Sequence, residues 1–287
     1  MIIEDSSLQD PGRLRWTYAV VPAALDVARA PAGVDGGRVE LVREGDVGAL
    51  VSPVNGATYA VDAEQLVGEV GWLAPRATAH DAVTTWASDR GAVVPLPMFT
   101  LYNDEAGVRA MLRERATSLA GLLARVSRGR EYVVRLYRLD DELAPALVDF
   151  SPRIATLERQ AAEATPGQRY LLQRKLETER REESRRVGHD LARTAWESLA
   201  ALSLDAVADE LPRAAEGARG AAILNAAFLV AHEGYAEFQA AVTELVRRHE
   251  GRGLRVEFTG PWPPHHFTRQ RERASEGTAD RAGEASA

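Results

Sequence analysis

The chain has no cysteine and a single lysine, Lys175, among its 287 residues. Without cysteine it can form no disulfide and no thiolate metal site, and it has no thiol nucleophile. It also has no run of about 18 apolar residues, and no basic segment followed by an apolar one, so we expect neither a membrane span nor a signal peptide. These absences predict a cytoplasmic protein that does not act at a membrane.

Motifs of the common enzyme classes are absent as well. The sequence contains no glycine-rich phosphate loop, no G-x-S-x-G segment and no H-E-x-x-H helix. Only His265 and His266 are neighbouring histidines, and adjacent residues of an extended segment point to opposite sides, so we expect no metal site there. The acids from Asp140 to Glu142 are better explained by a helix start, where the dipole favours negative charge, than by catalysis. We therefore expect no catalytic residue, metal or cofactor.

The charge balance disfavours a nucleic-acid partner. The net charge is −7, whereas nucleic-acid binders usually carry a basic excess because their affinity comes from neutralising phosphates. The length exceeds what one small core needs and fits two domains of ordinary size.

The first half predicts a mixed α+β domain over residues 14–128, after a flexible lead-in of residues 1–13. Aromatic and β-branched runs predict strands, and Gly45 supplies the tight turn of a hairpin. Pro95 and Pro97 require any strand near them to lie at a sheet edge or to begin late. Apolar residues at 3.6-residue spacing predict helices, the last of which ends at Gly129. The expected strands are Trp16–Val21, Val39–Arg43, Val47–Val54 and Val93–Met98, and the expected helices are Ala77–Arg90 and a single one from Asp104 to Val126.

The second half, residues 129–267, predicts a β-α-β-β-α-β order, the ferredoxin-like arrangement. Thr165, Pro166 and Gln168 have the form of a helix start, so a long helix begins at Pro166. The almost wholly apolar run Ala221–Val230 predicts a central strand. The expected strands are Tyr132–Leu139, a weak one within Leu202–Leu211, Ala221–Val230 and Leu254–Phe258; the expected helices run from Pro166 to about Ala200 and from Tyr235 past Val246.

Two segments offer little to a hydrophobic core. The ten residues Glu177–Arg186 carry no apolar side chain, so we expect a solvated stretch of helix; a charged contact for a partner protein is the alternative. Residues 268–287 mix arginines and acids with small residues and should form a disordered tail.

The segment from Thr259 to Phe267 encloses a tryptophan between prolines. Because each proline fixes φ and lacks a backbone donor, we expect the strand to stop at Phe258 and a stiff extended arm to follow. We expect Trp262 to pack back onto the protein as a buried anchor. Recognition of a partner by this arm is the alternative.

Several strings resemble the gas vesicle protein F/L family. The resemblance lies in the string LNAAFLV at Leu224–Val230, followed by GLRVEFTGPWPP at Gly253–Pro264. Three further segments also resemble family segments and stand in the family's order. His265 and His266 stand where the family often has an aromatic residue after the two prolines, and PLPMFT at Pro95–Thr100 is an altered form of another family segment. The further segments are Trp16–Pro22, Gly129–Tyr137 and Gly167–Lys175, and the motif residues, for which we expect structural roles, are Gly260, Pro261, Trp262, Pro263, Pro264, Asn225 and Phe228.

The resemblance implies a two-domain α+β protein that assists gas vesicle formation without catalysis. Its expected partners are the small hydrophobic shell subunit, which it would help to nucleate or keep soluble, and other gas vesicle accessory proteins. Two alternatives from other classes stay open. One is a ligand-binding protein or enzyme that uses a cleft between the domains, through His80 or His232. The other is an RNA-binding module, for which the central strand offers only Phe228 as a stacking aromatic.

Overall fold

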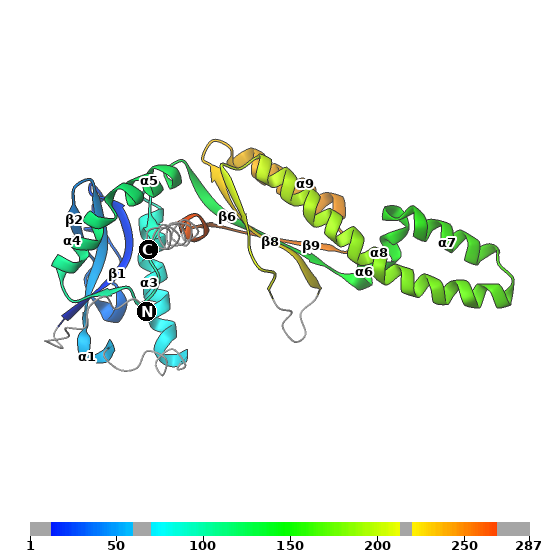
Figure 1. The fold of residues 1–287 in the computed structure, drawn as a ribbon, viewed down its shortest axis with the longest axis horizontal. Coiled ribbons are helices and arrows are strands. Elements are labelled where there is room, and N and C mark those ends of the chain that lie inside the picture. The colour runs from blue at the N-terminus through cyan, green and yellow to red at the C-terminus, as the bar shows by residue number, and fades with distance from the viewer. Residues whose placement is uncertain (1–12, 60–69, 213–219, 269–287) are drawn as a thin grey trace, which may run out of the picture. The chain divides into compact units, whose positions relative to one another are not determined.

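The structure, a computed structural model, describes residues 13–59, 70–212 and 220–268 (Figure 1). It is mixed α+β, as predicted, with two sheets. The chain forms two compact units, which divide between Arg130 and Glu131, two residues after the predicted boundary. The second unit ends at Pro261, and the described residues 262–268 belong to the first unit.

The first unit contains a five-stranded sheet in the order β2-β3-β1-β4, with β5 also paired to β1. The predicted hairpin is confirmed, because Glu44 pairs with Val47 and Gly45 turns the chain at a φ of +58°. The proline-containing strand lies at the sheet edge, as predicted, since Pro95 pairs only with β1. The strands are β1 (Arg13–Pro22), β2 (Glu40–Glu44), β3 (Val47–Asn55), β4 (Val94–Pro95) and β5 (Leu101–Tyr102).

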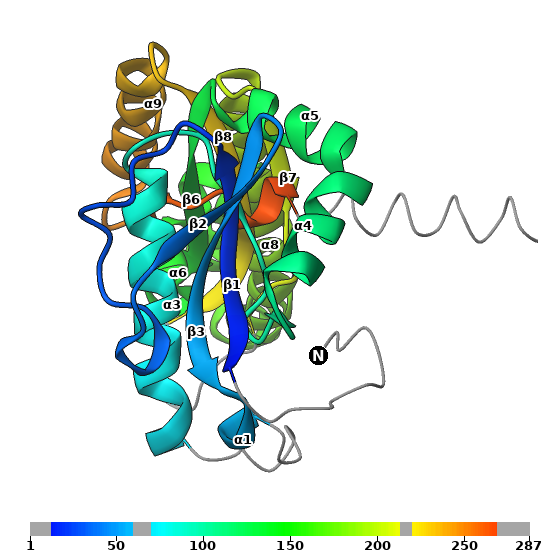
Figure 2. The ribbon, with the colours of Figure 1, turned by 90° about the vertical axis from the view of Figure 1, so that its left-hand side faces the viewer.

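Helices cover both faces of this sheet (Figure 2). Helix α3 packs with one face in a core around Trp16, and α4 and α5 pack with the other around Val20 and Leu112. The single helix predicted from Asp104 is two, because the backbone at Arg115 (φ −101°, ψ 11°) leaves the helical region between them. The helical elements are the 3-10 turn η1 (Val34–Gly36), α1 (Gly56–Tyr59), α3 (Val70–Ser88), α4 (Glu105–Glu114) and α5 (Ala116–Val126).

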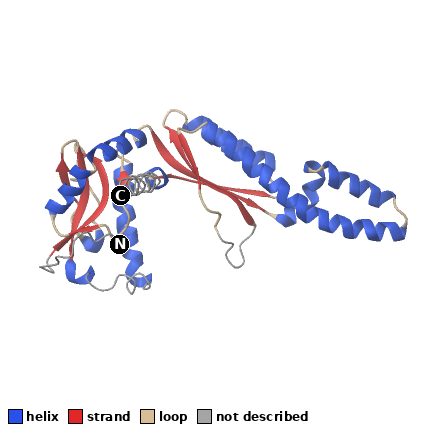
Figure 3. Cartoon of the chain, in the orientation of Figure 1, coloured by secondary structure: helices blue, strands red, loops and turns tan. Residues whose placement is uncertain are grey.

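The second unit has the predicted β-α-β-β-α-β order. Its four strands lie in the order β7-β8-β6-β9, which is the order of a ferredoxin-like sheet. Two helices cover one face around Phe228 and Phe238 (Figure 3). The elements are β6 (Gly129–Arg138), α8 (Pro166–Ala201), β7 (Asp205–Ala208), β8 (Ala221–Ala231), α9 (Tyr235–His249) and β9 (Leu254–Trp262).

Two helices that interrupt this pattern, α6 (Asp140–Phe150) and α7 (Pro152–Glu163), follow β6 and pack along the first half of α8 (Figure 3). They cover part of the charged stretch predicted to be solvated, and Glu183 and Ser184 within it are buried. The prediction failed because the added helices bring polar partners to part of this face. The hydrogen bonds and ion pairs are Ser184 Oγ to Asp140 (2.6 Å), Arg180 to Glu158 (2.7 Å) and Arg153 to Glu179 (2.5 Å).

Candidate functional site

The proline-rich segment is part of the sheet and not a separate arm. Strand β9 continues through Pro261 to Trp262, four residues past the predicted stop at Phe258. Gly260 allows this, because its φ is +124° and an added Cβ would lie 2.9 Å from the carbonyl oxygen of Glu131. Only glycine fits this close approach to β6. The two following prolines, Pro263 and Pro264, end the strand and are buried.

Trp262 is not the predicted buried anchor. Its exposed fraction is 47%, whereas that of Phe267 is 2%. After the prolines the chain forms a helical turn over residues 265–268, in which Thr268 Oγ1 donates to the carbonyl of Pro264 at 3.0 Å. This turn carries Phe267 into the interior, so Phe267 is the anchor of the segment. The sequence could not distinguish the two aromatics, because the turn that buries one of them was not predicted.

Two further motif residues lie on β8 and make internal contacts. Asn225 Oδ1 accepts from Arg135 Nε at 3.0 Å, and its Nδ2 donates to the carbonyl of Glu210 at 3.0 Å. Phe228 is fully buried, with its ring 5.7 Å from that of Trp196 and 5.4 Å from that of Phe238. Its ring faces the covering helices and is therefore not available to stack on a base.

The histidines singled out for a ligand cleft have different surroundings. His80 lies in the core of the first unit, where its Nδ1 accepts from the Trp16 indole at 3.0 Å. Burial lowers the pKa of His80, so the neutral form that accepts this bond is favoured. His232 is exposed in the turn that follows β8. His80 is thus held as a packing residue and does not face solvent.

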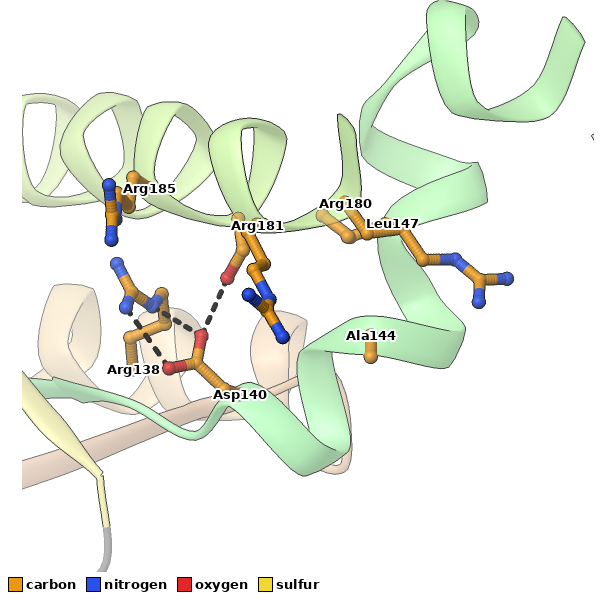
Figure 4. A pocket seen from close by; sticks show the side chains of 8 residues that line it. Arg138, Asp140, Ala144, Leu147, Arg180, Arg181 and Arg185 are labelled. Atoms are coloured by element: carbon orange, nitrogen blue, oxygen red, sulfur yellow. Dashed lines mark hydrogen bonds and ion pairs between the residues drawn. The ribbon is translucent and has the colours of Figure 1, made fainter. Parts of the chain in front are cut away.

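A pocket of about 340 Å³ lies within the second unit, between α6 and α8 (Figure 4). Its floor is apolar, formed by Ala144 and Leu147, and its rim is strongly basic. The sequence indicates the charged stretch of α8 but not this pocket, because nothing in the sequence places α6, which forms the other wall, beside α8. The polar lining residues are Arg138, Asp140, Arg180, Arg181, Ser184 and Arg185.

One side of the pocket is rigidly built. Arg138 donates through Nε and Nη2 to the two oxygens of Asp140, at 2.7 and 3.1 Å. The Arg138 guanidinium holds the pKa of the Asp140 carboxyl below its usual range, although partial burial opposes this. Gly188 lies against Arg138, and a Cβ there would meet its Cδ at 3.0 Å. A glycine inside a helix costs about 1 kcal/mol relative to alanine, and here it leaves room for the arginine.

The other side of the pocket is open. Arg180 turns away to its ion pair with Glu158, whereas Arg181 and Arg185 are exposed. Over the parts of the chain that the structure describes, neither Arg181 nor Arg185 forms an ion pair. Two guanidinium groups are therefore available to an anionic ligand.

The second unit also has an open sheet edge. Strand β9 is nine residues long and is the last in its sheet, and no strand among residues 13–59, 70–212 and 220–268 pairs with its outer side. Val256 and Phe258 are half-buried on this edge strand. The opposite edge strand, β7, has only four residues.

Two kinds of feature are absent from residues 13–59, 70–212 and 220–268. None of the helices in these segments is both long and apolar enough to cross a bilayer. The same residues contain no group of three histidine, aspartate or glutamate side chains placed to hold a metal ion.

Known proteins match this chain over nearly its whole length. A family model described as gas vesicle synthesis protein GvpL/GvpF matches residues 14–269. Gas vesicle protein L of a Streptomyces species is 30% identical over 270 residues, which cover 89% of this chain and 92% of that protein. Gas vesicle protein L1 of Halobacterium salinarum is 23% identical over 262 residues, with 88% and 89% covered.

Solved structures agree in fold. The crystal structure of GvpF from an Anabaena species matches with a TM-score of 0.62 at 17% identity, covering 90% of this chain and 97% of that chain. GvpF from Microcystis aeruginosa matches with a TM-score of 0.62 at 16% identity, covering 90% and 99%. The α+β fold is shared with these proteins. The family model and the sequence relatives show that the chain belongs to the GvpL/GvpF family of gas vesicle proteins.

Proposed function

We propose that this chain is a non-enzymatic accessory protein of gas vesicle formation that acts in the cytoplasm, associated with gas vesicles. It binds the small hydrophobic shell subunit, either to aid nucleation or to keep the subunit soluble, and it works together with other gas vesicle accessory proteins. It can remain in the finished vesicle as a minor component. The observation that carries this proposal is family membership over residues 14–269.

The physical need for such a protein follows from the chemistry of the client. A small hydrophobic subunit exposes apolar surface and unpaired strand edges before it assembles, and both promote aggregation. A second protein prevents this by covering them.

The open edge of β9 supports the proposal as a place for this contact. An added strand would extend the sheet through main-chain hydrogen bonds, which do not depend on the client's side chains. Val256 and Phe258 on this strand pack against the apolar core beside α9 but are only half-buried. An added strand would therefore also cover apolar surface that is now exposed. The short strand β7 offers less length for the same mode of binding.

Co-purification with the shell subunit tests the proposal. The tagged protein and the shell subunit are produced together, and shell subunit recovered in the soluble, tag-bound fraction is compared with that recovered by an unrelated acidic protein. We expect recovery well above the unrelated protein. Equal recovery in both would refute the proposal.

A pair of matched variants tests the edge itself. Val256→Lys places a charge on the edge strand, where a lysine blocks strand addition, and should reduce the recovered shell subunit. Val246→Lys makes the same change on the exposed side of α9 and should leave recovery unchanged. Circular dichroism and a urea titration confirm that both variants fold. Equal recovery with both variants would exclude the β9 edge as the contact.

A further inference from the structure

We propose that the basic pocket between α6 and α8 binds the carboxylates of an acidic helix on a partner protein. The juxtaposition that carries this is Arg181 and Arg185, exposed and without an ion pair in the described part of the chain, beside a pocket whose floor is apolar. The proposal goes beyond shell-subunit binding and does not rest on it, because its ligand is acidic and not apolar.

Two of the four arginines around the pocket have an ion-pair partner, and the other two have none among the described residues, although Arg185 acts at longer range on Asp140. Arg138 is neutralised by Asp140, and Arg180 by Glu158 at 2.7 Å. Arg181 and Arg185 remain, in a chain whose net charge is −7. A local positive site attracts anionic groups, whereas the acidic remainder of the protein surface repels them.

The spacing of the two arginines fits a helix as the ligand. Residues four apart on α8 lie one turn apart on the same face, about 6 Å along the axis. Two acidic residues one turn apart on a partner helix have the same spacing. Each guanidinium can then donate two parallel hydrogen bonds to one carboxylate, a geometry that arginine provides and lysine does not.

The rest of the pocket favours carboxylates over phosphate. The pocket already holds one carboxylate, because Asp140 accepts hydrogen bonds from Arg138 on both oxygens and from Ser184 Oγ at 2.6 Å. The side chain of Asp140 is 57% exposed, so its negative charge faces an incoming ligand. A phosphate dianion placed there meets stronger repulsion than single carboxylates held at Arg181 and Arg185. Ala144 is half-buried and provides a small apolar surface for the methylene groups of a glutamate side chain.

A designed peptide tests the proposal on the full chain. The probe is an alanine-rich helical peptide of about 16 residues with glutamates at i and i+4, labelled for fluorescence anisotropy. The comparison peptide has glutamine in place of each glutamate. We expect the glutamate peptide to bind and the glutamine peptide not to bind. Binding should weaken as salt is raised, because the charges are partly exposed.

Variants locate the binding. The double variant R181Q/R185Q should weaken binding by about tenfold or more, since it removes both charge-assisted contacts. The matched control R159Q/R174Q removes two exposed arginines outside the pocket, one on α7 and one on α8, and should change affinity by less than about twofold.

Three outcomes would overturn the proposal. These are no binding of the glutamate peptide, equal losses in the two double variants, and displacement of the peptide by inorganic phosphate at a concentration at which the same ionic strength of chloride does not displace it. The last result would assign the pocket to small anions. None of them bears on the recovery of the shell subunit, so this proposal and the proposed function can fail separately.

Discussion

Replacing Phe267 by alanine should destabilise the protein far more than replacing Trp262, although Trp262 is the larger residue. Phe267 is 2% exposed, and truncation of a buried phenylalanine costs about 3 to 5 kcal/mol through lost burial and the cavity left behind. Trp262 is 47% exposed, so about half of its burial is absent and its removal leaves no closed cavity. We expect about 1 to 2 kcal/mol for Trp262→Ala.

The two variants are compared with the parent protein by urea unfolding and by thermal unfolding, both followed by far-ultraviolet circular dichroism. For a domain of about 150 to 250 residues, each kcal/mol lost from the free energy of unfolding lowers Tm by about 2 to 4 °C. Phe267→Ala should therefore lower Tm by roughly 6 to 20 °C, and Trp262→Ala by a few degrees. If Trp262→Ala costs as much as Phe267→Ala, burial does not identify the anchor and the reasoning fails.

Three further predictions concern packing and protonation. Gly260→Ala should lower the free energy of unfolding by about 2 to 4 kcal/mol, measured by urea titration, because its φ of +124° and the nearby β6 backbone exclude a Cβ; a loss under about 0.5 kcal/mol would contradict the observed contact. Ser184→Ala should cost about 1 kcal/mol by the same measurement, because it removes a buried donor to Asp140; a gain in stability would show that the bond is not formed. Burial lowers the pKa of His80 and His249 below 6.5, and so the stability that their neutral forms contribute is fully present above pH 6.5 and is lost as the pH falls towards their folded pKa values. The urea midpoint should therefore decline between pH 7 and pH 5, and a constant or rising midpoint would refute this assignment.

The second sheet was predictable because its elements carry their own signals. The apolar run Ala221–Val230 has to be central in a sheet, and Thr165, Pro166 and Gln168 mark the start of α8. The structure shows the strand at Ala221–Ala231 and a capping box at Thr165 and Gln168. Local residue patterns determine such elements without knowledge of distant contacts.

Features that depend on contacts between distant residues were not predictable. Glu183 and Ser184 are buried although the ten charged and polar residues around them include no apolar side chain; Ser184 is bonded to Asp140 of α6, and Glu183 to Arg186 of α8 itself. The continuation of β9 through Pro261 depends on Gly260 against Glu131, more than 100 residues earlier in the chain. The pocket was missed for the same reason, because its walls come from two helices that the sequence did not bring together.

Soluble recovery of the shell subunit, with and without this protein, shows whether the protein keeps its client from aggregating. The shell subunit is produced alone, with this protein, or with an acidic protein of similar size, and the amount that remains in the supernatant after high-speed centrifugation is measured. We expect this protein to raise the soluble amount and to be recovered bound to the subunit. An unchanged soluble amount together with no bound subunit would contradict this expectation.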